Sequence, residues 1–97
     1  MHAVVNKLTL GRPFDNELLQ KIDSDFYPLV RPVPGFLDMR VVGVSDAEAI
    51  ILVFFETREA LNQGSALAAP WFAENIRPYL GGPVQRSVGE IISHSIH

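Results

Sequence analysis

The sequence contains no cysteine. This absence excludes disulfide bonds, a thiolate nucleophile, an iron–sulfur cluster and any zinc site with cysteine ligands. Because disulfides concentrate in secreted proteins, the absence also fits a cytoplasmic location, which we expect for this chain.

Basic charge and long apolar runs are lacking as well. Eight Lys and Arg residues against 11 Asp and Glu residues leave a formal net charge of −3, and the basic residues are scattered. A nucleic-acid-binding surface needs a basic stripe along the phosphate backbone, so we expect no nucleic-acid partner. No apolar run approaches the ~20 residues that span a bilayer, and residues 1–7 lack the pattern of a signal peptide. We therefore expect no membrane partner.

What is present is typical of one globular domain. The chain has 97 residues, of which 47% are hydrophobic and 20% charged, and we expect residues 1–97 to form a single domain. At this length folding hides only roughly 60–65% of the surface of the unfolded chain. The core is therefore thin, and association with a second copy would add stability.

Alternating and β-branched residues predict four strands, over residues 2–10, 36–44, 49–56 and 84–97. Asp15 is placed to cap a first helical region, which should weaken at Pro28. Thr57 is placed to cap a second helical region, which we expect to be interrupted near Gly64 and to restart around Pro70.

The order strand–helix–strand–strand–helix–strand predicts an α+β, ferredoxin-like βαββαβ fold. Its four-stranded antiparallel sheet should carry both helices on one face. Right-handed crossovers should place the first strand between the third and the fourth.

The third predicted strand is apolar on both faces. Its side chains alternate between one set, Ile50, Leu52 and Phe54, and another, Ala49, Ile51, Val53 and Phe55. A sheet with one solvated face shows polar residues at alternate positions. Two helices can cover only one face, so either this strand is simply very hydrophobic or a second copy covers the open face. We favour the second interpretation and predict a homodimer, a dimeric α+β barrel.

Three short segments, residues 6–10, 34–37 and 55–61, resemble the antibiotic biosynthesis monooxygenase-like (ABM) branch of the dimeric α+β barrel superfamily. The resemblance implies a homodimer whose two sheets pack into a barrel, and a cavity between the sheet and the helices of each monomer. Families of this kind include cofactor-independent oxygenases of polycyclic phenols and haem-degrading oxygenases.

Asn6 shares a strand face with Val4, Leu8 and Leu10, so it is an amide among apolar neighbours. A buried amide without partners costs on the order of 1–3 kcal/mol. Asn6 either bonds to nearby backbone or donates to a bound carbonyl, phenolate or oxygen species. In the haem-degrading branch, the Asn of the matching segment is a pocket residue.

Trp71 and Asn75 are four residues apart and so lie on one side of a helix. Oxygenases of polycyclic phenols use Asn and Trp in their pockets, and the resemblance thus makes Asn6, Trp71 and Asn75 the candidate catalytic residues. The alternatives are a packing role for Trp71 and a solvated position for Asn75. The aromatic candidates for substrate binding, which can equally be packing residues, are Phe26, Tyr27, Phe72 and Tyr79.

Haem and metal sites are poorly supported. The resemblance places the axial histidine of the haem-degrading branch on the second helix, but no histidine lies between Thr57 and Pro83, and Ile76 falls near the ligand position. His2, Glu90 and His94 share one parity and have the composition of a metal facial triad. Two of them lie near the chain ends, and we expect no metal.

The leading hypothesis is a small-molecule enzyme, an oxidoreductase similar to the cofactor-independent monooxygenases, that acts on an aromatic or polyketide-like substrate. In that chemistry an electron-rich substrate anion reduces dioxygen directly, with no cofactor. The protein supplies shape, desolvation and hydrogen bonds that favour the anion. The alternatives are a non-catalytic ligand-binding or stress-related barrel and, third, a haem-binding or haem-degrading protein.

Overall fold

The computed structural model describes residues 1–95. Its sheet consists of β1 (His2–Thr9), β2 (Phe36–Ser45), β3 (Glu48–Phe55) and β4 (Gln85–Glu90). The strands are antiparallel and follow the spatial order β2-β3-β1-β4. The prediction that the first strand lies between the third and the fourth is therefore confirmed.

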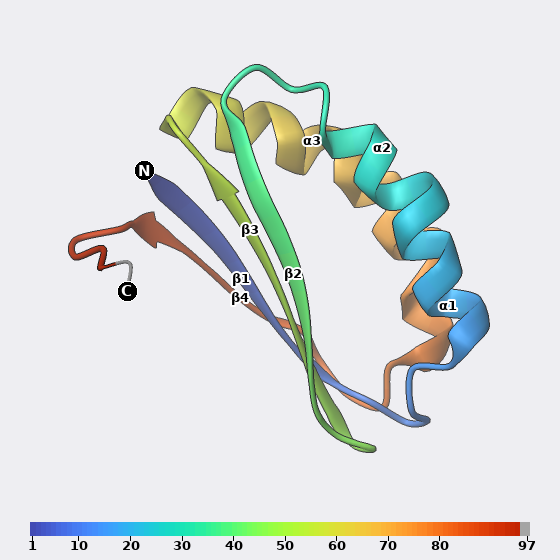
Figure 1. The fold of residues 1–97 in the computed structure, drawn as a ribbon. Helices are drawn as coiled ribbons and strands as arrows, with labels where there is room; N and C mark the ends of the chain where they lie inside the picture. Colours follow the sequence, from blue (N-terminus) through green and yellow to red (C-terminus); the bar gives the residue numbers. More distant parts are fainter. Residues whose placement is uncertain (96–97) are drawn as a thin grey trace.

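The helices all lie on one side of this sheet (Figure 1). The first helical segment runs without a break through α1 (Asn16–Lys21), the π-helical turn η1 (Ile22–Phe26) and α2 (Tyr27–Val30). The second consists of α3 (Arg58–Asn75), followed by the short 3-10 turn η2 (Arg77–Tyr79). The ferredoxin-like α+β fold expected from the sequence is confirmed.

Both predicted N-caps form. The Asp15 carboxylate accepts a hydrogen bond from the Leu18 N–H at 2.8 Å, and the Thr57 hydroxyl accepts one from the Ala60 N–H at 3.1 Å. Each cap satisfies a backbone donor that the first turn of a helix leaves free.

The first helical segment continues past Pro28 and ends at Val30. Proline has no N–H, so an ordinary α-helical turn would lose one hydrogen bond at this point. The chain widens into the π-helical turn immediately before it, where the Tyr27 N–H donates to the Ile22 carbonyl. The weakness expected at Pro28 therefore appears as a change of helix type, and the helix does not end there.

The predicted interruption near Gly64 and restart at Pro70 are wrong, because α3 is continuous through both residues. Gly64 is buried against β3, and a Cβ atom at this position would lie 2.5 Å from the Cζ atom of Phe55. The glycine thus serves close packing of the helix on the sheet. Pro70 and Ala66 are exposed, so the carbonyl that a proline leaves unpaired four residues earlier can face water.

The last strand is shorter than the predicted 84–97. The β1–β4 ladder ends at the pair His2 and Glu90, and Ile91 adds one backbone hydrogen bond to Met1 at 2.8 Å. Residues 91–95 turn away from the sheet on the side opposite the helices (Figure 1), and Ile92 is 95% exposed. The prediction for residues 96 and 97 lies outside the described residues.

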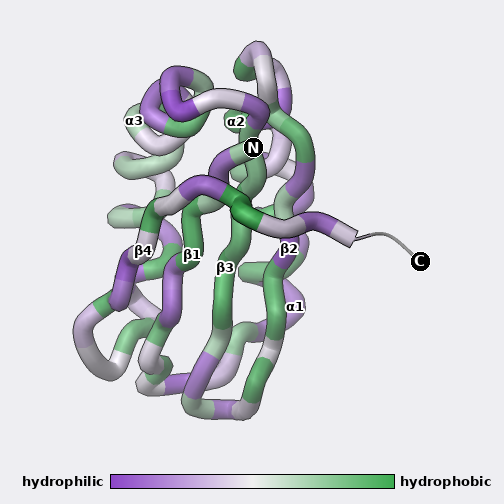
Figure 2. Tube along the Cα trace, turned by 90° about the vertical axis from the view of Figure 1, so that its left-hand side faces the viewer, coloured by the Kyte–Doolittle hydropathy of each residue, from purple (hydrophilic) through white to green (hydrophobic). Residues whose placement is uncertain are grey.

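The structure shows which side chains of the sheet point toward the helices and which point to the open face. Val4 and Leu8 of β1, with Ile51 and Val53 of β3, are buried beneath the helices. The other parity of β3 points to the open face, whose apolar residues are at least partly exposed: Val5, Leu37, Val42, Val44, Ile50, Leu52 and Phe54. Figure 2 looks onto this face and shows how hydrophobic residues dominate β3. Within residues 1–95 no helix covers it.

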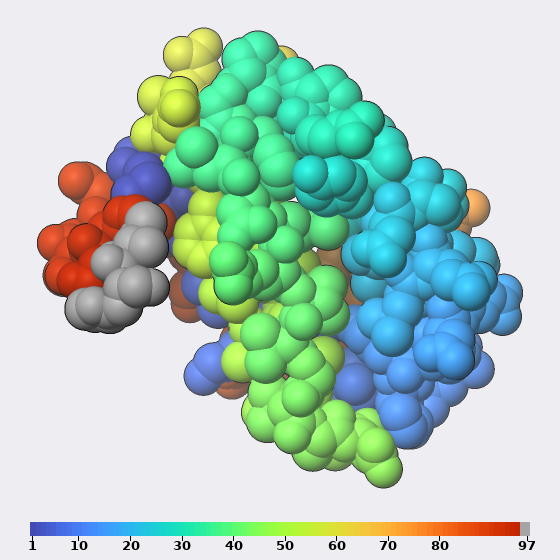
Figure 3. Space-filling model, viewed as in Figure 1, coloured from blue at the N-terminus to red at the C-terminus, as the bar shows by residue number. Residues whose placement is uncertain are grey.

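A narrow furrow separates β2 from the helical segment of residues 16–30 (Figure 3). Its lower part coincides with a hollow of about 440 Å³ whose lining includes Leu19, Val41 and Gly43. None of the helices in the described part of the chain has the length and apolar character needed to cross a membrane.

Candidate functional site

A cavity of about 630 Å³ lies between the helix-facing side of the sheet and the helical layer. This volume is within the range of ~300–1,000 Å³ typical of small-molecule pockets. Its apolar wall is built by side chains from both layers: Val4, Ile51 and Val53 from the sheet, and Phe26, Val30 and Phe72 from the helices. Several lining residues of β4 and α3 are exposed, Arg86, Ala69 and Ala73 among them, so the cavity opens between these two elements.

Asn6 lies in the middle of β1 and lines the cavity. In the register of the sheet it is opposite Ile51 on β3 and opposite Arg86 on β4. Its side chain is half-buried, and none of the side-chain hydrogen bonds among the described residues involves it. The bond to neighbouring backbone that a structural amide would make is not observed there, so the amide is available to a ligand.

Arg86 is a cavity residue that the reasoning from sequence did not select. Its Nη2 atom donates to the Ser65 hydroxyl of α3 at 3.0 Å, and both residues line the cavity. This hydrogen bond bridges β4 and α3 at the mouth. A signal was present in the sequence, because Arg86 alternates with Val84 and Val88, which pack against the core. A charged residue between two core positions of a strand must lie on the apolar face.

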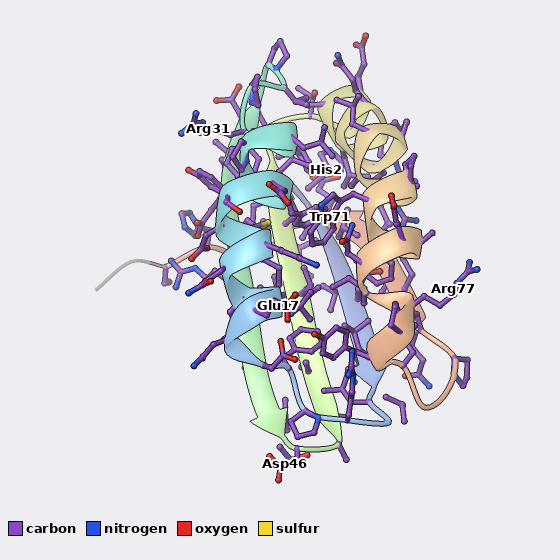
Figure 4. The ribbon with its side chains drawn as sticks, turned by 90° about the vertical axis from the view of Figure 1, so that its right-hand side faces the viewer. His2, Glu17, Arg31, Asp46, Trp71 and Arg77 are labelled. Carbon is purple, nitrogen blue, oxygen red and sulfur yellow. The ribbon has the colours of Figure 1, made fainter. Side chains whose placement is uncertain are left out.

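Phe26 and Phe72 line the cavity, whereas Trp71 does not. The Trp71 ring stacks on Phe26 with centroids 4.8 Å apart and an interplanar angle of 27°. Figure 4 shows Trp71 in the space between α2 and α3. The indole therefore supports a cavity wall from behind.

Asn75 and Tyr27 are also outside the cavity lining. The Asn75 side-chain amide donates to the Trp71 carbonyl at 3.0 Å, a local bond along α3. The Tyr27 ring packs edge-on against Phe36 with centroids 5.8 Å apart, and Arg31 lies over it. The structure thus brings Phe26 and Phe72 together with Asn6, but not Trp71, Asn75 or Tyr27.

Tyr79 belongs to a separate cluster at the end of α3. Its hydroxyl donates to both carboxylate oxygens of Asp15 at 2.9 Å, and the Arg12 guanidinium lies 4.0 Å from its ring centroid. The hydrogen bond from the Leu18 N–H, and then that from Tyr79, hold the pKa of Asp15 below its ordinary value. Burial, and then the Asp15 carboxylate, raise the pKa of Tyr79. Tyr79 is a protonated structural donor that does not line the cavity.

The three residues with facial-triad composition do not form a cluster. His2 and Glu90 pair in the β1–β4 register, while His94 is exposed beyond the end of β4. Within residues 1–95 no group of three His, Asp or Glu side chains is arranged to hold a metal ion. Ile76, which falls near the ligand position of the haem-degrading branch, is fully buried in the core.

No family model and no curated protein sequence matches this chain, but solved structures do. A monooxygenase, ActVA-Orf6 of Streptomyces coelicolor in complex with nanaomycin D, has a TM-score of 0.77 and 19% identity over 99% of this chain and 91% of its own. SnoaB, a cofactor-independent oxygenase from Streptomyces nogalater, has a TM-score of 0.71 and 14% identity, covering 96% and 94%. A dimeric ferredoxin-like protein from an uncultured marine organism has a TM-score of 0.73 and 14% identity over the whole of both chains.

These similarities extend over nearly the entire chain at low identity, so they show the fold. The structures similar to this protein include ABM-like proteins with a ferredoxin fold. The resemblance drawn from residues 6–10, 34–37 and 55–61 is confirmed at this level.

Proposed function

We propose that this protein is a small-molecule enzyme of the cofactor-independent monooxygenase type, acting on an aromatic or polyketide-like substrate in the cavity between sheet and helices. The observation that carries the proposal is the unpartnered amide of Asn6 among mostly apolar residues that line a cavity of about 630 Å³. An apolar pocket with a few convergent polar groups is the usual form of a small-molecule site. Two structurally similar proteins, a monooxygenase and a cofactor-independent oxygenase, support the assignment.

In this chemistry the protein binds the substrate, donates a hydrogen bond to it and excludes water. An electron-rich substrate anion passes electrons to dioxygen, and Asn6 stabilises the anion by donating a hydrogen bond to its oxygen. Phe26 and Phe72 enclose the ring system and exclude water, which strengthens that hydrogen bond. Removal of one such donor typically costs on the order of 10²–10³ in rate.

Trp71 has an indirect role in this proposal. Its stacking on Phe26 holds one aromatic wall of the cavity in place, and Asn75 braces the same turn of α3 through the Trp71 carbonyl. Both are positioning residues, because neither lines the cavity.

The working form of the protein in this proposal is a homodimer. The open face of the sheet carries Val42 and Val44, which are 43% and 51% exposed, beside the half-buried Ile50, Leu52 and Phe54 of β3. An apolar patch of this kind on a single copy marks an interaction surface. The structural similarity to a dimeric ferredoxin-like protein favours a second copy as the partner.

Aerobic and anaerobic incubation of the protein with a panel of polycyclic phenols tests the enzyme assignment. Oxygen-dependent consumption of one phenol, with an oxygenated product detected by mass spectrometry, is expected. Saturable binding of phenols without any oxygen-dependent product would contradict an oxygenase.

One observation favours the alternative of a non-catalytic ligand-binding protein. Among the described residues that line the cavity there is no carboxylate and no histidine, so the wall offers no ordinary general base. A substrate that ionises only with the help of a base would bind here without turnover. The same incubation distinguishes the two functions.

A further inference from the structure

We propose that the ligand of this cavity carries a carboxylate, and that Arg86 binds this group at the cavity mouth. The inference rests on the proposed function in one respect, namely that the cavity holds a small molecule. It goes beyond that function by assigning a charged group to the ligand and a specificity-determining role to Arg86.

The sheet places Arg86 beside Asn6. The two residues are direct partners in the β1–β4 register and both line the cavity, so their side chains project from the same face of the sheet. Residues directly opposite each other in an antiparallel pair have Cβ atoms about 4.5–5.5 Å apart. A ligand that reaches the Asn6 amide therefore passes within reach of the Arg86 guanidinium.

The hydrogen bond to Ser65 orients the Arg86 guanidinium and leaves most of its N–H donors free for a ligand. A guanidinium has five N–H donors, and the Ser65 hydroxyl takes one of them from Nη2 at 3.0 Å. Neither of the two salt bridges among the described residues involves Arg86. The planar fork thus retains donors for two oxygen atoms, which is the geometry in which arginine binds a carboxylate.

The charge of the cavity wall has one sign. Its two charged residues within the described chain are Arg77 and Arg86. Arg77 is exposed, and Figure 4 shows its side chain extending outward from the helical layer. A cleft lined by positive charge and low-dielectric walls attracts anions, and a carboxylate carries its charge at neutral pH without the help of a base in the pocket.

Isothermal titration calorimetry of the full chain with matched naphthalene probes tests the inference. At neutral pH we expect 2-naphthoate to bind about tenfold more tightly than the uncharged 2-naphthamide, because hydrogen bonds between charged groups are stronger than neutral ones. Arg86→Gln should remove this preference while changing the affinity for 2-naphthamide less than about twofold. Arg86→Lys, which keeps the charge but loses the fork, should give an intermediate preference.

Arg58→Gln is the matched control, because Arg58 is an exposed residue at the start of α3, outside the cavity lining, and the variant loses the same charge. It should retain the preference for the carboxylate. Arg86 is exposed on an edge strand, so Arg86→Gln should unfold at the same temperature as the wild type within a few degrees.

Equal affinity of the wild type for 2-naphthoate and 2-naphthamide, or a preference that survives in Arg86→Gln, would overturn the inference and leave the proposed function standing. Failure of every probe to bind would overturn both. The last titration uses a nitrated naphtholate that is ionised at neutral pH, which carries a negative charge without a carboxylate. If its binding depends on Arg86 and that of 2-naphthoate does not, the carboxylate assignment is wrong.

Discussion

The Tyr79 hydroxyl donates hydrogen bonds of 2.9 Å to both carboxylate oxygens of Asp15, a residue 64 positions earlier in the chain. Asp15 is also the N-cap of α1, through its bond from the Leu18 N–H. One carboxylate therefore joins the start of the first helical segment to the end of the second. Both hydrogen bonds favour the ionised form of Asp15, because they hold its pKa below the ordinary value.

This pair predicts a pH dependence of stability. The pKa of Asp15 in the folded protein lies below its ordinary value of 3.8, so the native state binds the proton less tightly than the unfolded state. The stabilisation is fully present above the unfolded pKa and is lost as the pH falls through the lower folded pKa. Urea denaturation should show Asp15→Asn to be less stable than the wild type at neutral pH, with the difference shrinking below a pH of about 3.8.

Tyr79→Phe is the companion variant, because it removes the donor and keeps the ring that Arg12 and Phe14 contact. The stability difference between Tyr79→Phe and the wild type should also shrink as Asp15 becomes protonated. A deficit that persists unchanged in acid would show that the hydroxyl acts independently of the carboxylate.

Gly64→Ala should destabilise the protein. A Cβ atom there would lie 2.5 Å from the Phe55 ring, so the ring or the helix must shift. Overpacking of this kind costs typically ~1–3 kcal/mol, which outweighs the gain of up to ~1 kcal/mol from the better helix propensity of alanine. Urea denaturation measures the free energy of unfolding.

Gly43→Ala is the matched control, since a Cβ atom at Gly43 meets nothing within 4 Å. Its free energy of unfolding should change by less than about 0.5 kcal/mol, as for most surface substitutions. Equal effects of the two variants would contradict the packing argument.

Leu52→Asp should disrupt the dimer, whereas Ile51→Asp should disrupt the fold. Leu52 lies half-exposed on the open face, whereas Ile51 is 2% exposed in the core beneath the helices. Light scattering of the wild type should give about twice the chain mass of 10.8 kDa, and Leu52→Asp should give a folded monomer. Ile51→Asp should unfold the chain, because a buried unpaired carboxylate is costly.

An interface made by the open face should bury more than ~1,200 Å² in total. Circular dichroism of Leu52→Asp checks that secondary structure is retained. A dimer that persists in this variant would place the interface elsewhere.

Asn6→Ala should lower turnover of any substrate found by about 10²–10³-fold, with little change in stability. The reason is that the amide makes no hydrogen bond within the described residues, so its loss leaves no partner unsatisfied. Steady-state kinetics and thermal unfolding measure the two effects. Asn62→Ala on the exposed side of α3 is the control and should alter neither. Loss of stability with unchanged ligand binding would make Asn6 a structural amide.

Sequence reasoning was most successful where a residue pattern directly determines local structure. The apolar run of residues 49–55 predicts a strand with apolar side chains on both faces, and Asp15 and Thr57 predict the two helix starts, because a cap needs only a side chain and the nearby N–H. It was least successful at Gly64 and Pro70. At Gly64 the intrinsic preference against helix is overridden by close packing on Phe55, a residue of another element. At Pro70 the exposed position of Ala66 lets water satisfy the carbonyl that proline leaves unpaired.

The candidate site was likewise predictable from the sequence only in part. The sequence by itself determined that Asn6 shares a strand face with Val4, Leu8 and Leu10, because alternation along a strand is a property of the backbone. Only the tertiary structure decided that this face looks into the cavity, since both faces of the sheet are apolar and the pattern cannot distinguish them. Strand register put Arg86 beside Asn6, and the orientation of α3 turned Trp71 and Asn75 away from the cavity. Both depend on how elements distant in sequence pack, which no local pattern records.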